Sequence, residues 1–446
     1  MPKQAGETHN APQSANGRTP AQRVRDWARW MWVEQSVWTP RMLEALARGV
    51  KGGKWFSLWD KVWAPATLEA SFARTQANKG KPGVDGVTIE RFGRDLGPNI
   101  AALSELLRTG GYQPQKIRRT YIPKAGSTEL RPLGIPTVRD RIVQGALRSV
   151  LEPIFERDFA DHSYGFRPRL GCKDALRRVD ELLNGGYAWV VDADIKGYFD
   201  TIPHEQLMAL VEKKVSDGKV LALLRAYLKA GILDGMKTWE PTEGTPQGAV
   251  VSPLLSNIYL DPLDHLMAGK GYEMVRYADD FVVLCRSQEE AQAALSEISA
   301  WMAEAELTLH PTKTRLVDAT LPGGFEFLGY HFERGKKWPR KKSQDKLKDT
   351  IRAKTRRANG QSMERTIKTV NQSLHGWFEY FKLSVPGAFK RLDEWIRMRL
   401  RSILRKRERR RGPGKGSAHR KWPNDFFARL GLFSMVEARK SVIQPA

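Results

Sequence analysis

Cysteine is almost absent from this sequence of 446 residues, which contains only Cys172 and Cys285. Two cysteines exclude a disulfide scaffold and a four-cysteine zinc site, and isolated thiols are the expected state. Long apolar runs are also missing, because no window approaches the roughly 18 uncharged apolar residues that a membrane span needs. The N-terminus lacks the basic-then-apolar pattern of a secretory signal. We therefore expect a protein of the bacterial cytoplasm that makes no membrane contact.

Acidic residues are too few to balance the basic ones. The sequence has 74 Lys and Arg against 50 Asp and Glu, which gives a net charge of +24 and a pI near 10.0. Nearly all of the excess lies in residues 334–421, where 29 basic residues accompany only 7 acidic ones. A helix face that is merely solvated would carry balancing acids. The imbalance therefore predicts a nucleic-acid partner, although charge alone does not distinguish RNA from DNA.

Hydrophobic spacing divides the chain into a mixed part and a helical part. Almost no large apolar side chains occur in residues 1–20, which are expected to form a flexible tail. Up to residue 332, predicted strands and helices mix without fixed alternation, which favours the α+β class. The strands are predicted at 189–195, 273–276 and 281–285. From residue 345 onward only helices are predicted, notably 363–381 and 389–407, each with an apolar face and a basic face.

Two pairs of acidic residues fall in predicted β-structure. Asp279 and Asp280 lie at the tip of a predicted hairpin, and Asp192 and Asp194 share one face of strand 189–195. Paired Asp residues are also common in surface turns, so the hairpin pair alone does not decide between a turn and a site. Carboxylates this close repel one another unless a cation lies among them. In a strongly basic protein this combination favours two Mg²⁺ ions and nucleotidyl transfer.

The residues around these acids resemble those of bacterial group II intron reverse transcriptases, also called maturases. Tyr277 to Asp280 reads YADD, the box of reverse transcriptases. Similar motifs follow in family order: GVDG (83–86), YIPK (121–124), LRPLGIPTVRDRIVQ (130–144), SYGFRP (163–168), DIKGYFD (194–200), GTPQGAVVSPLLSNIYL (244–260), KTRLV (313–317) and FEFLGYHF (325–332). One such box would be weak evidence, whereas the whole ordered series is specific. The similarity extends from residue 71 to about residue 433.

This resemblance implies a right-hand polymerase, with fingers and an antiparallel palm sheet followed by an all-α thumb that doubles as the maturase domain. LHGWFEYF at 374–381 is similar to the thumb motif of the family. The expected domains are a tail (1–20), an N-terminal extension with fingers and palm (21–332), the thumb (333–408) and a basic, candidate DNA-binding segment (409–446). No CxxC pair follows the thumb, so an endonuclease-lacking type is expected.

The resemblance also assigns roles to single residues. Asp194, Asp279 and Asp280 would bind two Mg²⁺ ions with help from the Ile195 carbonyl, and Asp192 is the rival of Asp194 because it shares the same face. Phe199 follows Asp194 by five residues and would exclude a ribose 2′-hydroxyl, thereby selecting deoxynucleotides. The other assigned residues are Lys124, Arg131, Gln247 and Lys313 for nucleotide binding, Phe327, Leu328 and Gly329 for the primer grip, and Arg405, Lys406, Arg407, Arg409 and Arg410 for nucleic acid.

Each assignment has a plainer structural alternative. Phe199 could simply pack in the core, Lys124 could be a solvated charge, and Gln247 could belong to an ordinary turn. Lys313 could be a salt-bridge partner, since a lone Lys more often is. An apolar strand end would explain the primer-grip segment equally well.

The implied function is an RNA-directed DNA polymerase that extends a DNA primer on an RNA template with dNTPs. The resemblance further implies binding of intron RNA and target DNA, with roles in splicing and retrohoming. One alternative is a domesticated reverse transcriptase of antiviral defence, CRISPR adaptation or repair synthesis. Another is a splicing cofactor without catalysis, which the intact carboxylates disfavour.

Overall fold

The computed structural model describes residues 30–443 except 51, 124–129, 359 and 411–415. The expected tail at 1–20 and the expected nucleotide ligand Lys124 lie outside these residues. In the described part of the chain, helices and strands are mixed up to residue 339 and only helices follow, which confirms the α+β prediction. Within the described part of the chain, no helix combines the length and the apolar character that a membrane crossing requires.

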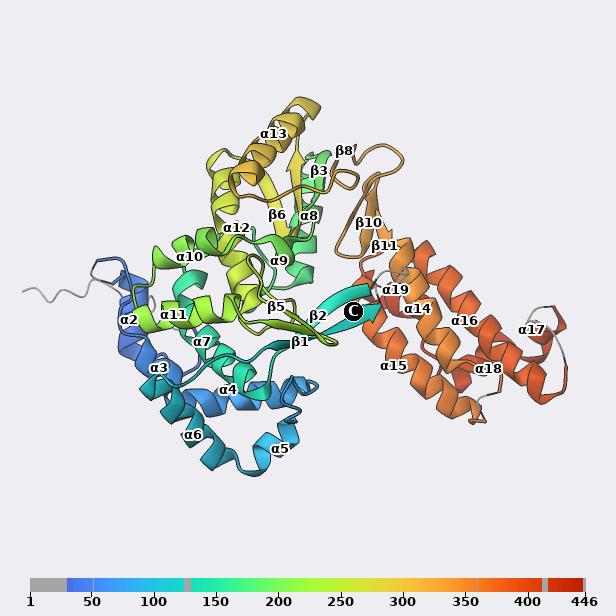
Figure 1. The fold of residues 1–446 in the computed structure, drawn as a ribbon. Helices are drawn as coiled ribbons and strands as arrows, with labels where there is room; N and C mark the ends of the chain where they lie inside the picture. The colour runs from blue at the N-terminus through green and yellow to red at the C-terminus, as the bar shows by residue number, and fades with distance from the viewer. Residues whose placement is uncertain (1–29, 51, 124–129, 359, 411–415, 444–446) are drawn as a thin grey trace, which may run out of the picture.

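Six helices form the N-terminal framework (blue to teal in Figure 1). They are α2 (Pro40–Arg48), α3 (Trp59–Trp63), α4 (Pro65–Asn78), α5 (Ile89–Arg94), α6 (Leu96–Thr109) and α7 (Val138–Glu156). Nearly every residue of α7 is buried, and its start is fixed by the Thr137 hydroxyl, which accepts from the Asp140 amide at 3.1 Å. Helix α4 packs along α7, where the Ser71 hydroxyl donates to the Ile142 carbonyl at 2.7 Å. Helix α7 is therefore the centre of this framework.

A four-stranded sheet extends from the framework in the order β2-β1-β4-β5. Its strands are β1 (Ile117–Pro123), β2 (Leu130–Ile135), β4 (Ile232–Asp234) and β5 (Lys237–Trp239). Strands β1 and β2 form an antiparallel hairpin, while β1 and β4 pair in parallel. The Arg119 guanidinium on β1 lies over the Trp239 ring, 5.0 Å from its centroid, and so links β1 to the edge strand β5.

A second sheet, entirely antiparallel, has the order β6-β7-β3-β8. Its strands are β3 (Trp189–Asp194), β6 (Glu273–Tyr277), β7 (Asp280–Cys285) and β8 (Arg315–Asp318). Helices α8 (Cys172–Asn184), α12 (Ser252–Gly269) and α13 (Gln288–Glu304) pack on this sheet. The same part of the chain forms α9 (Tyr198–Thr201), α10 (His204–Glu212) and α11 (Gly218–Leu228). Val191 and Val190 are buried in different hydrophobic clusters, on opposite faces of β3. Burial of both faces explains the nearly unbroken apolar run at the start of this strand.

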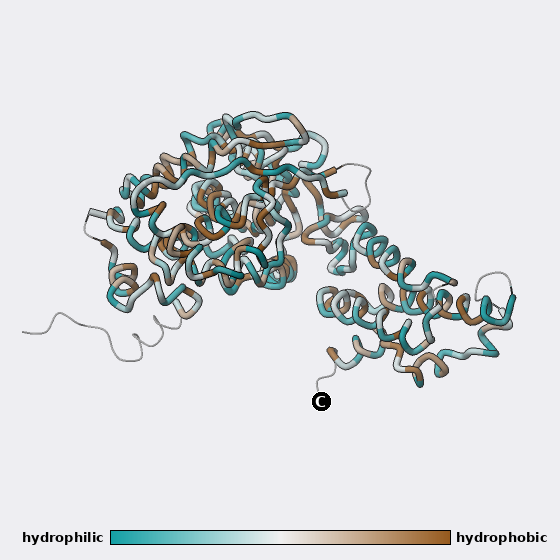
Figure 2. The backbone as a smooth tube through the Cα atoms, turned by 60° about the horizontal axis from the view of Figure 1, so that its bottom comes forward, coloured by the Kyte–Doolittle hydropathy of each residue, from teal (hydrophilic) through white to brown (hydrophobic). Residues whose placement is uncertain are grey.

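The C-terminal part begins with a small antiparallel sheet in the order β11-β10-β9. Its strands are β9 (Phe325–Phe327), β10 (Tyr330–Glu333) and β11 (Lys336–Pro339). The helices that follow are α14 (Lys341–Lys354), α15 (Met363–Phe381), α16 (Pro386–Arg407), α17 (Ser417–Lys421), α18 (Asn424–Arg429) and α19 (Met435–Ile443). These helices gather on one side of the molecule, and hydrophilic and hydrophobic residues alternate along them (Figures 1 and 2).

One hydrophobic cluster connects this helical part to the antiparallel β3 sheet. It runs from Val190 and Val282 through the stacked rings of Phe325 and Phe332, whose centroids are 5.0 Å apart, into α15 and α16. Trp422, Phe427 and Met435 belong to the same cluster, so the segments that contain them share the core of α15 and α16. The position of the helices relative to the sheet is therefore fixed by a shared core.

Candidate active site

The acidic residues meet at one end of the antiparallel β3 sheet. In the register of β3 and β7, Asp194 lies directly opposite Asp280, and Asp192 lies opposite Val282. Cross-strand partners share a face, so Asp192, Asp194 and Asp280 point to the same side. Further along β3, this side is covered by the second hydrophobic cluster, where Val190 and Val282 are buried. The covered apolar face thus ends in a group of carboxylates.

Asp279 lies in the two-residue turn that joins β6 to β7. Tyr277 pairs with Asp280, which leaves Ala278 and Asp279 as the loop. Ala278 has a φ of 61°, a left-handed conformation that is uncommon for any residue with a Cβ and resembles the first position of a type II′ turn. Gly165 packs directly on this turn, since a Cβ at that position would lie 2.2 Å from the Ala278 nitrogen. The hairpin tip that bears Asp279 is therefore closely packed from outside.

The carboxylates raise one another's pKa values. Burial, together with the nearby charges of Asp279, Asp192 and Asp194, raises the pKa of Asp280 to about 7. Burial also raises the pKa of Asp279, and the charge of Asp194 adds to that rise. The pKa of Asp192 is raised by burial and lowered in part by Arg315, whose nitrogen lies 3.2 Å from the Asp192 carboxylate. Acidic residues whose pKa values are raised by burial and by neighbouring charges are typical of functional sites.

Lys313 lies where it can compete for the Asp194 carboxylate. Its Nζ donates to Asp194 Oδ2 at 2.6 Å. In this structure Lys313 is therefore a salt-bridge partner, which was the plainer alternative for this residue. Among the described residues, no group of three or more His, Cys, Asp or Glu side chains is arranged to hold a metal ion. The donor chemistry nevertheless fits Mg²⁺, which takes carboxylate oxygens from one or two acids. Asp279 and Asp280 provide such oxygens next to Asp194.

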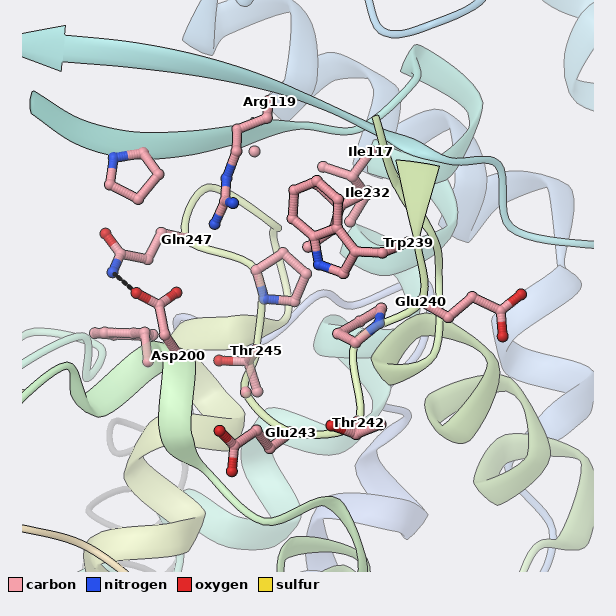
Figure 3. Close-up of a pocket in the computed structure, with 16 residues that line it drawn as sticks. Ile117, Arg119, Asp200, Ile232, Trp239, Glu240, Thr242, Glu243, Thr245 and Gln247 are labelled. Atoms are coloured by element: carbon pink, nitrogen blue, oxygen red, sulfur yellow. Dashed lines mark hydrogen bonds between the residues drawn. The ribbon is translucent and has the colours of Figure 1, made fainter. Parts of the chain in front are cut away.

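A chain of hydrogen bonds from the four-stranded sheet connects two of the expected nucleotide-binding residues, Arg131 and Gln247, to Asp200. Arg131 Nε donates to Gln247 Oε1 at 2.8 Å, and Gln247 Nε2 lies 3.5 Å from Asp200 Oδ2. Figure 3 shows Gln247 and Asp200 facing each other at the edge of a cavity of about 270 Å³. Phe199 lines the same cavity and is 8% exposed. Arg131, Gln247 and Phe199 are thus brought together, as the resemblance implied.

The Phe199 ring has both core neighbours and an exposed neighbour. Its centroid lies 5.5 Å from that of Tyr198, which is buried, and 6.4 Å from that of Phe166, which is exposed. Phe166 in turn contacts Tyr277 of the YADD box, with centroids 6.5 Å apart. Phe199 therefore packs on the buried Tyr198 ring and on Phe166, and Phe166 connects it to the YADD box.

The expected primer grip is the turn between β9 and β10. Leu328 and Gly329 are its two loop residues, with φ values of 46° and 85°. The Phe327 side chain is 1% exposed and points into the core. The turn is held by the helices that follow, because the Tyr380 hydroxyl donates to the Leu328 carbonyl at 2.8 Å. This turn is thus fixed at the junction between the small sheet and α15.

The five expected nucleic-acid-binding cations lie at and just after the C-terminal end of α16. Arg405 is half-buried, whereas the other four are exposed. Cations at a helix C-terminus are also favoured by the helix dipole. They are far along the chain from the acids and belong to the helical part of the molecule (Figure 1).

Comparison with known proteins identifies the family of this chain. Residues 122–332 match the family model described as reverse transcriptase (RNA-dependent DNA polymerase), and residues 344–422 match the group II intron, maturase-specific domain. Protein YkfC of Escherichia coli K12 is 33% identical over 347 residues, which are 70% of this chain and 87% of that protein. The chain belongs to the group II intron reverse transcriptase and maturase family. Its fold is accordingly the right-hand polymerase fold, as the sequence predicted.

Other relatives of this reverse transcriptase are matched over shorter regions. The group II intron-encoded protein LtrA of Lactococcus lactis is 41% identical over 196 residues, 44% of this chain, and the match spans about a third of LtrA (32%). Among solved structures, a Cas6-RT-Cas1–Cas2 complex aligns with 27% identity and a TM-score of 0.36 over 55% of this chain and 26% of that chain. The family assigns RNA-directed DNA polymerase activity to this reverse transcriptase.

A group of buried polar residues behind the YADD turn was not predicted from the sequence. Arg276, Asp264 and Asn257 are all at most 2% exposed and hydrogen-bond to one another. The available signal was Arg276 itself, a charged residue that follows the apolar pair Met274 and Val275 directly before Tyr277. An ionised side chain in such a strand requires buried partners.

Proposed function

We propose that this chain adds deoxynucleotides to a primer 3′-hydroxyl on an RNA template with the help of two Mg²⁺ ions bound by Asp194, Asp279 and Asp280. The observation that carries this proposal is the cross-strand pairing of Asp194 with Asp280, with Asp279 in the adjoining turn. Three mutually repelling carboxylates in a basic protein are explained most simply by a cation site.

The chemistry follows from where these groups lie. The primer 3′-oxygen forms a bond to the α-phosphorus of the dNTP, the bond to the pyrophosphate oxygen breaks, and the hydroxyl proton passes to solvent. The metal ions, when bound, neutralise the charge that develops on the attacking and leaving oxygens. Asp194 would exchange its ion pair with Lys313 for the metal, with the Ile195 carbonyl as an additional ligand. Lys313 would then be released to donate a proton to pyrophosphate.

The groups around the cavity would bind the nucleotide. Arg131, with its forked guanidinium, is suited to phosphate oxygens, and its bond to Gln247 sets its direction. Lys124 is proposed as a second phosphate ligand on the basis of its YIPK motif. Phe199 would lie against the sugar and exclude a 2′-hydroxyl. The turn at Phe327, Leu328 and Gly329 would hold the primer end.

The helical part is proposed to bind intron RNA. Its excess of basic residues, together with the match to the maturase-specific domain, supports a role in splicing and, with target DNA, in retrohoming. In the proposed division, fingers and palm occupy residues 21–332, the thumb 333–408, and a basic DNA-contacting segment 409–446.

The catalytic assignment is tested by primer extension on poly(rA)/oligo(dT) with dTTP and Mg²⁺. Replacing either Asp194 or Asp279 with Asn removes a ligand charge, and we expect the extension rate to fall by about 10³-fold. Asp192→Asn is the matched control, because Asp192 lies on the same strand face but is paired with Arg315. It should retain extension within about ten-fold of the parent rate. Full activity of Asp279→Asn would refute the proposal, and loss with Asp192→Asn alone would transfer the role to Asp192.

A further inference from the structure

The guanidinium of Arg276 is completely buried behind the YADD turn. Its Nε donates to Asp264 Oδ1 at 2.7 Å, and its Nη2 donates to the other oxygen of the same carboxylate. Both side chains have zero exposure. This bidentate pair uses only one edge of the guanidinium. The remaining nitrogen, Nη1, is available for other partners.

Nη1 connects the YADD turn to helix α12. It donates to the Ala278 carbonyl at 2.9 Å and to Asn257 Oδ1 at 3.0 Å. Ala278 is the left-handed residue that precedes Asp279. The fixed carboxylate of Asp264 therefore sets the position of the guanidinium, and the guanidinium sets the direction of the Ala278 peptide.

The same residues also fasten the loop that packs on the turn from outside. Asn257 Nδ2 donates to the Gly165 carbonyl at 2.8 Å. The backbone of Arg276 accepts from the Tyr164 amide at 2.8 Å and donates to the His162 carbonyl at 2.9 Å. Gly165 thereby contacts the Ala278 backbone closely. Arg276 and Asn257 thus hold both sides of the turn.

The backbone conformation of Ala278 explains why the turn needs the hydrogen bonds from Arg276 and Asn257. A positive φ brings the Cβ of a non-glycine residue close to its own backbone, so the turn would relax if it were free. Relaxation would rotate the peptide that leads into Asp279 and move its carboxylate relative to Asp280 and Asp194. A buried ion pair that only stabilised the core would not need a bond to this carbonyl.

We propose that Arg276 is a positioning residue for the YADD turn. Asp264 and Asn257 hold its guanidinium, and the guanidinium holds the strained Ala278 peptide. The carboxylates of Asp279 and Asp280 are thereby kept in place to bind divalent cations. The proposal rests on the metal-binding role proposed above for Asp279 and Asp280. It assigns no contact between Arg276 and substrate.

The test compares Arg276→Lys with Ala278→Gly and with the double variant. Lys keeps a positive charge beside Asp264 but cannot make the forked contact. Glycine adopts a positive φ without strain, so the turn of Ala278→Gly should depend less on the hydrogen bonds from Arg276. Three quantities are measured: hydrogen exchange of peptides covering residues 277–281 in the protein alone, Mn²⁺ affinity of the protein without substrates, and the Mg²⁺ concentration that gives half-maximal primer extension.

We expect Arg276→Lys to speed exchange in the turn, to weaken Mn²⁺ binding and to raise the half-activating Mg²⁺ concentration by about ten-fold, with little change in KM for the template–primer. Ala278→Gly should restore much of this loss in the double variant. Arg401→Lys is the matched control, because Arg401 is 1% exposed and bonded to the Trp422 carbonyl in the helical part. It should lower the melting temperature without changing the half-activating Mg²⁺ concentration.

The outcomes separate this inference from the proposed function. The positioning role alone is overturned if folded Arg276→Lys shows unchanged hydrogen exchange in the turn and an unchanged Mg²⁺ dependence while Asp279→Asn still abolishes extension. Activity in Asp279→Asn would overturn the metal site itself. If Arg276→Lys does not fold, Asn257→Ala replaces it, because it leaves the Arg276–Asp264 pair intact. A smaller change in the same direction supports the proposal, and no change in Asn257→Ala contradicts it.

Discussion

At the scale of the single residue, Phe199 gives the sharpest prediction about substrate choice. Its ring packs against Tyr198, and the residue lines the cavity together with Gln247. Phe199→Val replaces the ring with a smaller aliphatic side chain and should admit ribonucleotides, because an apolar contact that excludes one hydroxyl is worth about 10- to 200-fold in discrimination. The measurement is the ratio of kcat/KM for dTTP and UTP on poly(rA)/oligo(dT).

The matched control for Phe199→Val is Phe92→Val. Phe92 is also buried, but it packs against Phe72 in the N-terminal framework. This variant should lower stability and leave the dTTP to UTP ratio unchanged. A ratio that survives Phe199→Val would show that the ring only packs, which was the plainer alternative for this residue.

At the scale of the element, the YADD hairpin depends on a glycine in a different segment. A Cβ on Gly165 would lie 2.2 Å from the Ala278 nitrogen, a distance that neither backbone can tolerate without moving. Gly165→Ala should therefore reduce extension by at least about 100-fold, because small displacements of reacting groups have large effects on rate. Primer extension and melting temperature measured on the same sample separate displacement from unfolding.

Gly171→Ala is the matched control in the same stretch of chain. Gly171 has ordinary extended backbone angles, and the nearest atom to a Cβ there is 3.9 Å away. This variant should keep both extension and stability close to those of the parent. Equal losses in the two variants would mean that the region is simply intolerant of substitution.

At the scale of the whole molecule, charge separates the acid-bearing sheet from the basic helices. Replacing Arg405, Lys406, Arg407, Arg409 and Arg410 with Gln should weaken RNA binding. It should also reduce the slope of log K against log salt by about 3, because each phosphate contact contributes about 0.7 on single strands. Filter binding of a structured RNA from 50 to 300 mM salt, in roughly the range where such effects are measured, provides the readout.

A matched control takes exposed cations from the other end of the molecule. Arg91 and Arg94 on α5 are exposed, and their replacement with Gln should leave the salt slope unchanged. If the slope is also unchanged in the α16 variant, those five cations do no more than solvate the helix end and interact with its dipole.

The sequence by itself determined the fold class, the polymerase family and the acids. Short apolar runs located β3 and β7, because both strands are buried, and a 3.6-residue apolar repeat located α15, because this helix buries one face. Helix α16 begins earlier than predicted, at Pro386, because proline at the first turn of a helix has no apolar signal. The resemblance of the ordered motifs singled out Asp194, Asp279 and Asp280, which the structure brings to one end of the β3 sheet.

Only the tertiary structure decided which partners these residues have. Two contacts join segments far apart in the chain: Asp194 pairs with Asp280, and Lys313 donates to the Asp194 carboxylate. The bond from Arg276 to the Ala278 carbonyl is local, but it depends on partners in helix α12. No local pattern encodes them, since a side chain's partner is set by how sheets and helices pack. Gly165 is the clearest case, because its need for a hydrogen in place of a Cβ arises entirely from a turn more than a hundred residues away.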